Sequence, residues 1–416
     1  MDNLVRSLKA HEPVRIRGGR CALGPTQSIP ASMQIADGRI THLETELSSM
    51  STGGSACTEI DLSGFLVMPG LVNAHDHLQF ALFPRLGDPP YRNYIDWGED
   101  IHRKFPEIIA RHRSVPKEVR LWWGGIRNLL CGVTTVCHHD MLWSELQKEE
   151  FPIRVVQHFG WAHSFALGGE LRQARLATGA GCAFIMHACE GIDEQARQEI
   201  FSLDKLGLLD DKTVLVHGLA LDAAGVALMC QRGTSLIVCP SSNAFLFDKL
   251  PDMAMLGLLD DITLGNDSPL TAVGDLLDEI RYAVRSCGIA PTAAYRMVSQ
   301  APASILRLGN EAGSLTVTGP GDLIAVRDTN QAPADRLVTL SIIDVEFVML
   351  GGRVQLASEK ILEQLPLREK IGLEPLWIDG IVRWLRAPVK ELLRKAEEVL
   401  GRGEVRLGGK PIRIPE

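Results

Sequence analysis

The ten residues LVNAHDHLQF, at positions 71–80, place two histidines one residue apart at the end of an apolar run. Side chains alternate along a strand, so a strand that extends this far would direct His75 and His77 to the same side. Two neutral imidazoles on one side are able to bind a single metal ion. One core histidine and one loop histidine would give the same pattern, so this pair alone leaves both interpretations open.

A polar residue after an apolar run recurs at three later positions. His187 ends CAFIMH, His217 ends TVLVH and Asp267 ends ITLGND. A polar side chain in such a place loses its hydrating water and needs another partner. A metal ion or a catalytic hydrogen-bond network would provide that partner, so the recurrence favours a metal centre built from several strand ends.

The elements that must position these residues are indicated by the pattern of the chain from about residue 66. Apolar runs rich in Val, Ile and Leu alternate there with amphipathic helical patterns. This alternation is typical of a parallel sheet covered by helices, and we predict an α/β fold with an eight-stranded barrel. In such barrels, catalytic groups collect at the carboxyl ends of the strands.

Short strands and turns are predicted towards both ends of the chain. Residues 12–66 alternate apolar stretches with glycine and small polar residues, and this pattern returns after the barrel through about residue 356. We expect residues 1–66 and 312–416 to form a small β domain with C-terminal helices, and residues 67–311 to form the barrel. The tail segments EPLWIDGIVRWLRAP and VKELLRKAEEVLGRG are both predicted to be helical.

Composition and charge limit the class of protein. Hydrophobic residues make up 45% and charged residues 23% of the 416 residues, as in an ordinary globular enzyme. The formal net charge of −8 gives no basic face for nucleic acid or an anionic membrane, so the expected partner is a small molecule. The apolar LWIDGIVRWL segment leaves open a homo-oligomer.

The compartment is predicted from what the sequence lacks. The first twenty residues contain no apolar signal region, and no apolar run is long enough to span a bilayer. The nine cysteines are scattered, without the close pairs of a disulfide framework or a zinc knuckle. We therefore expect a cytoplasmic protein with reduced thiols.

Five motifs in order, PGLVNAHDH, MHACE, VLVHG, CPSSN and LGNDS, resemble the amidohydrolase superfamily. The resemblance is closest to its mononuclear-metal branch, which contains cytosine, guanine and adenosylhomocysteine deaminases and the triazine hydrolases. It implies a distorted (β/α)8 TIM barrel with a β-sandwich formed from both chain ends. It also implies one metal ion per subunit, with the ligands His75, His77, His187 and Asp267. Three nitrogens and one carboxylate suit Zn²⁺, with Fe²⁺ as the alternative.

The resemblance further implies hydrolysis by a metal-bound hydroxide. Glu190 would carry a proton from the water to the substrate, His217 would bind the oxyanion or orient the hydroxide, and Asp267 would assist as a base. An acid at a helix start is also a common structural feature, which is the alternative for Glu190. We expect hydrolytic deamination of an aminated purine, pyrimidine, pterin or triazine. The alternatives are hydrolysis of another C–N or C–Cl bond, such as dechlorination or cyclic amide hydrolysis, and a catalytically silent amidohydrolase-like binding protein.

Three further residues are candidates for substrate contacts. Gln79 closely follows His77, although it would equally cap a loop, and His138 lies in CHHD at the end of the second predicted strand. His163, in GWAHSF, either lines the substrate pocket or has a core or loop role. Only about 30 residues separate the third predicted strand PIRVV from AFIMH. Either the third strand–helix unit is abbreviated, or the fourth strand is FGWAHSF and follows almost directly.

Overall fold

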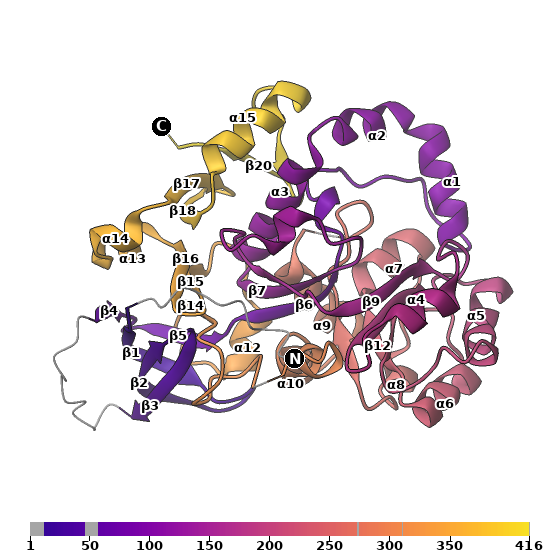
Figure 1. Cartoon of the computed structure of the whole chain (residues 1–416), viewed down its shortest axis with the longest axis horizontal. Helices are drawn as coiled ribbons and strands as arrows, with labels where there is room; N and C mark the ends of the chain where they lie inside the picture. Colours follow the sequence, from indigo (N-terminus) through magenta and orange to yellow (C-terminus); the bar gives the residue numbers. More distant parts are fainter. Residues whose placement is uncertain (1–11, 46–56, 273, 310, 416) are drawn as a thin grey trace.

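The two ends of the chain form one 12-stranded sheet in the computed structural model, which describes residues 12–45, 57–272, 274–309 and 311–415 (Figure 1). The N-terminal strands are β1 Val14–Ala22, β2 Ser28–Ala36, β3 Arg39–Thr45, β4 Thr58–Asp61 and β5 Phe65–Pro69. The C-terminal strands are β14 Leu323–Arg327, β15 Val345–Leu350, β16 Arg353–Ala357, β17 Leu373–Ile378, β18 Ile381–Arg386, β19 Arg406–Leu407 and β20 Lys410–Arg413. Strand β5 joins the two groups, because it lies parallel to β1 and antiparallel to β14.

The tail segment EPLWIDGIVRWLRAP is not helical, and this prediction was wrong. It forms the antiparallel strands β17 and β18, with Ile378 opposite Ile381 across a two-residue turn. The turn residues Asp379 and Gly380 have φ angles of 51° and 82°. Asp-Gly is favoured in hairpin turns that need positive φ at both positions, and this local signal outweighed the apolar spacing. The second predicted tail helix is present as α15 Val389–Leu400.

Parallel strands form a three-stranded and a five-stranded sheet in the described part of the chain. The first contains β6 Leu71–Asp76, β7 Val133–His138 and β8 Arg154–Val155. The second contains β9 Phe159–Ser164, β10 Ala183–Ala188, β11 Thr213–His217, β12 Ser235–Val238 and β13 Ile262–Leu264. Most of their residues are buried, as expected for parallel strands that are covered on both faces. The first and last strands meet beyond β13, where the Asp267 N–H donates to the His75 carbonyl at 3.1 Å.

Helices follow most of the parallel strands, which makes the fold a mixed α/β fold (Figure 1). The helices of this part are α1 Tyr94–Lys104, α2 Pro106–Arg113, α3 Lys117–Leu130, α4 Leu171–Ala177, α5 Glu194–Lys205, α6 Ala223–Arg232, α7 Pro240–Phe247, α8 Met253–Leu256, α9 Leu276–Cys287, α10 Pro291–Met297 and α11 Gln300–Ile305. Short 3₁₀ helices lie at η1 Leu78–Phe80 and η2 Ser144–Gln147, and α12 Pro333–Leu337, α13 Glu359–Gln364 and α14 Leu367–Lys370 accompany the large sheet. Apolar residues of α3, α5, α6, α9, α10 and α12 pack with the strands in one large buried cluster.

The connection after the third parallel strand decides between the two alternatives for that region. Only residues 156–158 separate β8 from β9, so the fourth strand is FGWAHS and no helix precedes it. This arrangement brings the end of β9, including His163, close to the ligand strand β10, which pairs with it in parallel.

Within the described residues, no helix combines the length and the apolar character that a membrane span requires. All nine cysteines are free thiols.

Candidate functional site

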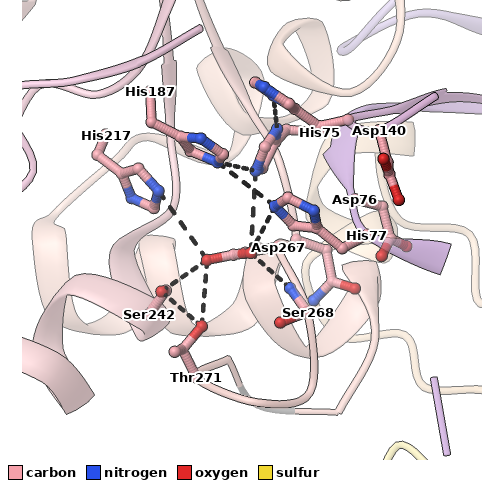
Figure 2. Close-up of polar contacts among 12 residues, drawn as sticks. His75, Asp76, His77, Asp140, His187, His217, Ser242, Asp267, Ser268 and Thr271 are labelled. Carbon is pink, nitrogen blue, oxygen red and sulfur yellow. Dashed lines mark hydrogen bonds and ion pairs between the residues drawn. The ribbon is translucent and has the colours of Figure 1, made fainter. Parts of the chain in front are cut away.

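The four predicted metal ligands converge at the carboxyl ends of the parallel strands (Figure 2). His75 lies in β6, His77 directly follows that strand, His187 lies in β10, and Asp267 follows β13. The His187 Nε2 atom is 3.2 Å from His75 Nε2 and 3.4 Å from His77 Nε2. The Asp267 Oδ1 atom is 3.8 Å from His75 Nε2 and 3.8 Å from His77 Nε2.

These separations fit ligands around one divalent ion. Ligand atoms about 2.1 Å from a shared tetrahedral centre lie about 3.4 Å from one another, close to the separations found here. The donors are three imidazole nitrogens and one carboxylate oxygen, a set that suits zinc. Burial and the neighbouring imidazoles hold the pKa values of His75 and His187 well below the usual range, so both rings are neutral and have a lone pair for a metal.

A relay of hydrogen bonds fixes which nitrogen of His75 carries the proton. The His139 Nε2 atom is 2.9 Å from the Ala162 carbonyl oxygen, which can only accept, so this nitrogen donates. The His139 Nδ1 atom then accepts from His75 Nδ1, 3.3 Å away, and the His75 Nε2 lone pair faces the other ligands. In the same way, His187 Nδ1 donates to the His163 carbonyl oxygen at 2.5 Å.

We expect His139→Phe to weaken zinc binding by about 10–100-fold, because His75 would lose the acceptor that orients its ring. The measurement is the zinc dissociation constant, obtained by competition with a chromophoric chelator. His139→Gln is the matched variant, since its side chain keeps one acceptor and one donor, and a smaller loss is expected. Equal zinc affinity in the wild-type protein and His139→Phe would contradict the relay.

Asp267 is held in place by one hydroxyl group from another segment and one from its own segment (Figure 2). Its Oδ2 atom accepts from Ser242 Oγ at 2.8 Å and from Thr271 Oγ1 at 3.1 Å, and its Oδ1 atom accepts from the Ser268 N–H at 2.7 Å. Burial acts to raise the pKa of Asp267, but His217, His77 and these hydrogen bonds outweigh it and lower the pKa. The carboxylate is therefore ionised and oriented towards the imidazoles.

Glu190 and His217 lie next to this cluster. The Glu190 Oε1 atom is 3.6 Å from His217 Nε2, which is itself 4.0 Å from Asp267 Oδ2. His217 Nδ1 contacts the side-chain oxygen of Asn243 at 3.0 Å, so Asn243 orients the imidazole. Burial, together with the carboxylates of Asp267 and Glu199, raises the pKa of Glu190 well above its ordinary value. This buried carboxyl group is thereby suited to hold and release a proton.

The backbone around Glu190 is tied to helix α1. Cys189 has a φ of 54°, and its N–H donates to Glu199 Oε2 at 2.7 Å. The Tyr94 N–H donates to the Glu190 carbonyl at 3.2 Å, and Asn93 pairs with Gly191 as an isolated bridge. The carboxyl group and the start of α1 are therefore positioned together.

A cavity of about 250 Å³ lies over the cluster. Its polar floor is formed by His77, His163, His187, Glu190, His217, Asp267, Ser268 and Thr271. Its outer wall is formed by Phe80, Phe83, Tyr94, Trp97, Gly98, Ile101, His102, Ile109, Arg113, Leu167 and Leu270. Local patterns gave no signal for this wall, because most of it comes from helices and turns in residues 80–113.

Two of the three predicted substrate contacts are not among the residues that line the cavity. The Gln79 amide donates to Asp140 at 3.1 Å, and His138 Nδ1 accepts from the Leu78 N–H at 3.3 Å. Because neighbouring side chains at the end of β7 point in different directions, His139 rather than His138 faces His75. Of the three candidates, only His163 lines the cavity, at its floor.

Asp76, between the two histidines of β6, belongs to a buried network behind them. Both its carboxylate oxygens accept from Arg127 Nη2 at 2.9 Å, and Asn128 Nδ2 donates to it at 2.7 Å. Arg127 also donates to the Asp267 carbonyl oxygen at 2.9 Å and to the Asn266 side chain at 2.6 Å. The network therefore connects the backbone of two ligand-bearing segments.

Comparison with known proteins agrees with this architecture. A model of the amidohydrolase family matches residues 157–354. A 5-methylthioadenosine/S-adenosylhomocysteine deaminase of Natronomonas pharaonis is 24% identical to this chain. The match includes 94% of this chain and 99% of that protein. A second such deaminase, from Archaeoglobus fulgidus, is also 24% identical, over 61% of this chain and 69% of that protein.

Two solved structures extend the similarity to the fold. An adenosine deaminase from Xanthomonas campestris with bound zinc has a TM-score of 0.66 and 18% identity, covering 92% of this chain and 97% of that one. The atrazine chlorohydrolase of Arthrobacter aurescens, complexed with zinc, has a TM-score of 0.68 and 14% identity. The match covers 93% of this chain and 99% of that one. With the ordered motifs in the sequence, these similarities lead to one conclusion: the chain is similar to the amidohydrolase family over residues 157–354, and its fold is that of zinc-bound hydrolases.

Proposed function

We propose that this protein is a metal-dependent hydrolase that deaminates an aminated heterocycle. The observation that carries the proposal is a buried carboxyl group with a raised pKa, Glu190, beside three imidazoles and a carboxylate spaced for one metal ion. Glu190, His77, His187 and Asp267 line the floor of one cavity. The similarity to 5-methylthioadenosine/S-adenosylhomocysteine deaminases supports the same reaction class.

The ion would be held by His75, His77, His187 and Asp267, one per subunit, with zinc the first choice and Fe²⁺ the alternative. When bound, such an ion lowers the pKa of a coordinated water from 15.7 towards about 7.

We also infer that the two parallel sheets close as a distorted (β/α)8 barrel and that the large sheet folds as a β-sandwich. The hydrogen bond from Asp267 to the His75 carbonyl supports closure between the last and first strands.

Each residue of the floor then has a defined task. Glu190 accepts a proton from the attacking water and gives it to the ring nitrogen next to the carbon under attack. The water oxygen forms a bond to that carbon while the ring π bond opens. His217 hydrogen-bonds this oxygen, because its Nε2 atom faces Glu190 and Asp267. Glu190 then takes the proton of the new hydroxyl group and delivers it to the amino group, the C–N bond breaks, and ammonia leaves. The oxygen forms a C=O bond to the same carbon, and the ring nitrogen keeps its proton.

Hydrolysis of a C–Cl bond or of another C–N bond is the second candidate, supported by the likeness to an atrazine chlorohydrolase. The leaving group distinguishes the two reactions. Ammonia must be protonated before it leaves, whereas chloride needs no proton. Burial raises the pKa of Glu190, so this carboxyl group is able to hold a proton and pass it to a leaving amine, which favours the amine as leaving group.

The test is a panel of matched heterocycles on zinc-loaded protein of known metal content. Each ring (purine, pyrimidine, pterin and triazine) is supplied with an amino, an alkylamino or a chloro substituent at the same carbon. We expect ammonia release to be the fastest reaction, and a chelator-treated sample to lose it and regain it when zinc is added. Faster chloride release, or ammonia release that persists after metal removal, would contradict the proposal.

A further inference from the structure

The outer half of the cavity is an apolar surface. Phe80, Phe83 and Trp97 line it, together with Ile101, Ile109, Leu167 and Leu270. Several of these side chains belong to a packed hydrophobic cluster, in which the Phe80 and Phe83 rings lie edge to face with centroids 5.3 Å apart. Because this cluster backs the wall, the wall is a preformed surface for an apolar group.

Several polar atoms of the same wall already have partners within the protein. The Tyr94 hydroxyl accepts from the Ala166 N–H at 3.0 Å and donates to Glu199 at 3.3 Å. Trp97 Nε1 donates to the Leu86 carbonyl at 2.9 Å, and His102 Nδ1 lies 2.8 Å from the Gly98 carbonyl. A substrate hydroxyl that entered this region would therefore find few partners.

The part of the outer wall that the structure describes also contains no carboxylate. Among the described residues that line the cavity, the only carboxylates are Glu190 and Asp267, and both lie at the floor. A sugar presents neighbouring hydroxyl groups, which lose their water on binding and need acceptors in return. The exposed Arg113 at the rim can only donate. The wall is thus poorly matched to a ribosyl group and well matched to a hydrocarbon.

We propose, on the basis of the deaminase function above, that the heterocycle carries an alkyl or aryl substituent rather than a sugar. The aminated ring lies at the polar floor, and the substituent lies between α1, α2 and the Phe80–Phe83 turn. Each methylene removed from water is expected to tighten binding about fourfold. Each hydroxyl placed against the same wall is expected to weaken binding, because its lost water is not replaced.

The test measures binding, so that it does not depend on turnover. Isothermal titration calorimetry on the zinc-loaded Glu190→Gln protein, which is expected to turn over too slowly to disturb the titration, compares each aminated ring unsubstituted and with 2-methylbutyl, 2,3-dihydroxypropyl, benzyl and ribosyl groups. The 2-methylbutyl and 2,3-dihydroxypropyl groups have the same shape. They differ only at two positions, where the first has methyl groups and the second has hydroxyl groups. We expect 2-methylbutyl to bind about tenfold or more tighter than 2,3-dihydroxypropyl. We expect the ribosyl compound to bind no tighter than the bare ring.

Leu167 supplies a matched pair of variants. It is exposed and lines the cavity, whereas Leu176 is exposed on α4 and is not among the lining residues. Leu167→Asn is expected to weaken binding of the 2-methylbutyl compound severalfold and to leave the bare ring unaffected. Leu176→Asn is expected to change neither, and both surface substitutions should leave the fold intact.

The outcomes separate the two proposals. Tighter binding of the alkyl compounds without ammonia release would uphold the apolar substituent and overturn deamination. If ammonia is released but the ribosyl or dihydroxypropyl compounds bind most tightly, the apolar substituent is overturned and deamination is upheld. Affinity that does not rise when an alkyl group is added would also overturn the inference.

Discussion

Glu190→Gln is expected to lower kcat/KM for ammonia release by about 10²–10⁴-fold while the zinc content stays unchanged. The amide has nearly the shape of the carboxyl group but can neither take up nor give away the proton that the reaction moves. Metal binding should persist, because Glu190 is not among the grouped ligand atoms. The measurements are initial rates of ammonia release and metal analysis of the same preparation.

Glu194→Gln is the matched control for this prediction. Glu194 is the first residue of α5, four positions further along the chain, and its side chain is exposed. The same chemical change there should leave the rate at the wild-type value. A Glu190→Gln protein with full activity would remove Glu190 from the reaction and leave it the structural role of a helix-start acid.

Arg127→Met is expected to lower the free energy of unfolding by about 3–5 kcal/mol. The substitution leaves the Asp76 carboxylate buried without its charged partner, and it removes donors to the Asn266 side chain and the Asp267 carbonyl. The loss is large because both partners are buried, so water cannot replace the missing contact. Urea unfolding of the metal-free proteins measures it without a contribution from metal binding.

Two further variants test the origin of this loss. Arg394→Met removes an exposed arginine that pairs with Glu391 and Glu398 on α15, and no measurable change in stability is expected. Adding Asp76→Asn to Arg127→Met should recover part of the stability, because the buried charge is then gone. A stability for Arg127→Met equal to that of Arg394→Met would show that the buried pair contributes nothing.

The sequence predicted the residues that converge, because their signal is local. A polar residue directly after an apolar run stands where a buried strand ends, and parallel strands end at one edge of a sheet. His75, His77, His187 and Asp267 follow this rule. The structure groups the ligand atoms of His75, His77 and His187, and it groups Asp267 with His75 and His217. The mixed α/β pattern and the helix at VKELLRKAEEVLGRG were predicted for the same reason, since both depend on short-range periodicity.

The supporting contacts were decided only by the tertiary structure. His139 rather than His138 contacts His75, and this depends on how β7 ends against β6. Ser242 donates to Asp267 from a segment that follows another strand. The apolar wall depends on how residues 80–113 pack over the floor. Such contacts join residues far apart in the chain, and their geometry follows from the packing of whole elements. Local spacing therefore determines which side chains reach the strand ends, and packing determines what surrounds them and which substrate they fit.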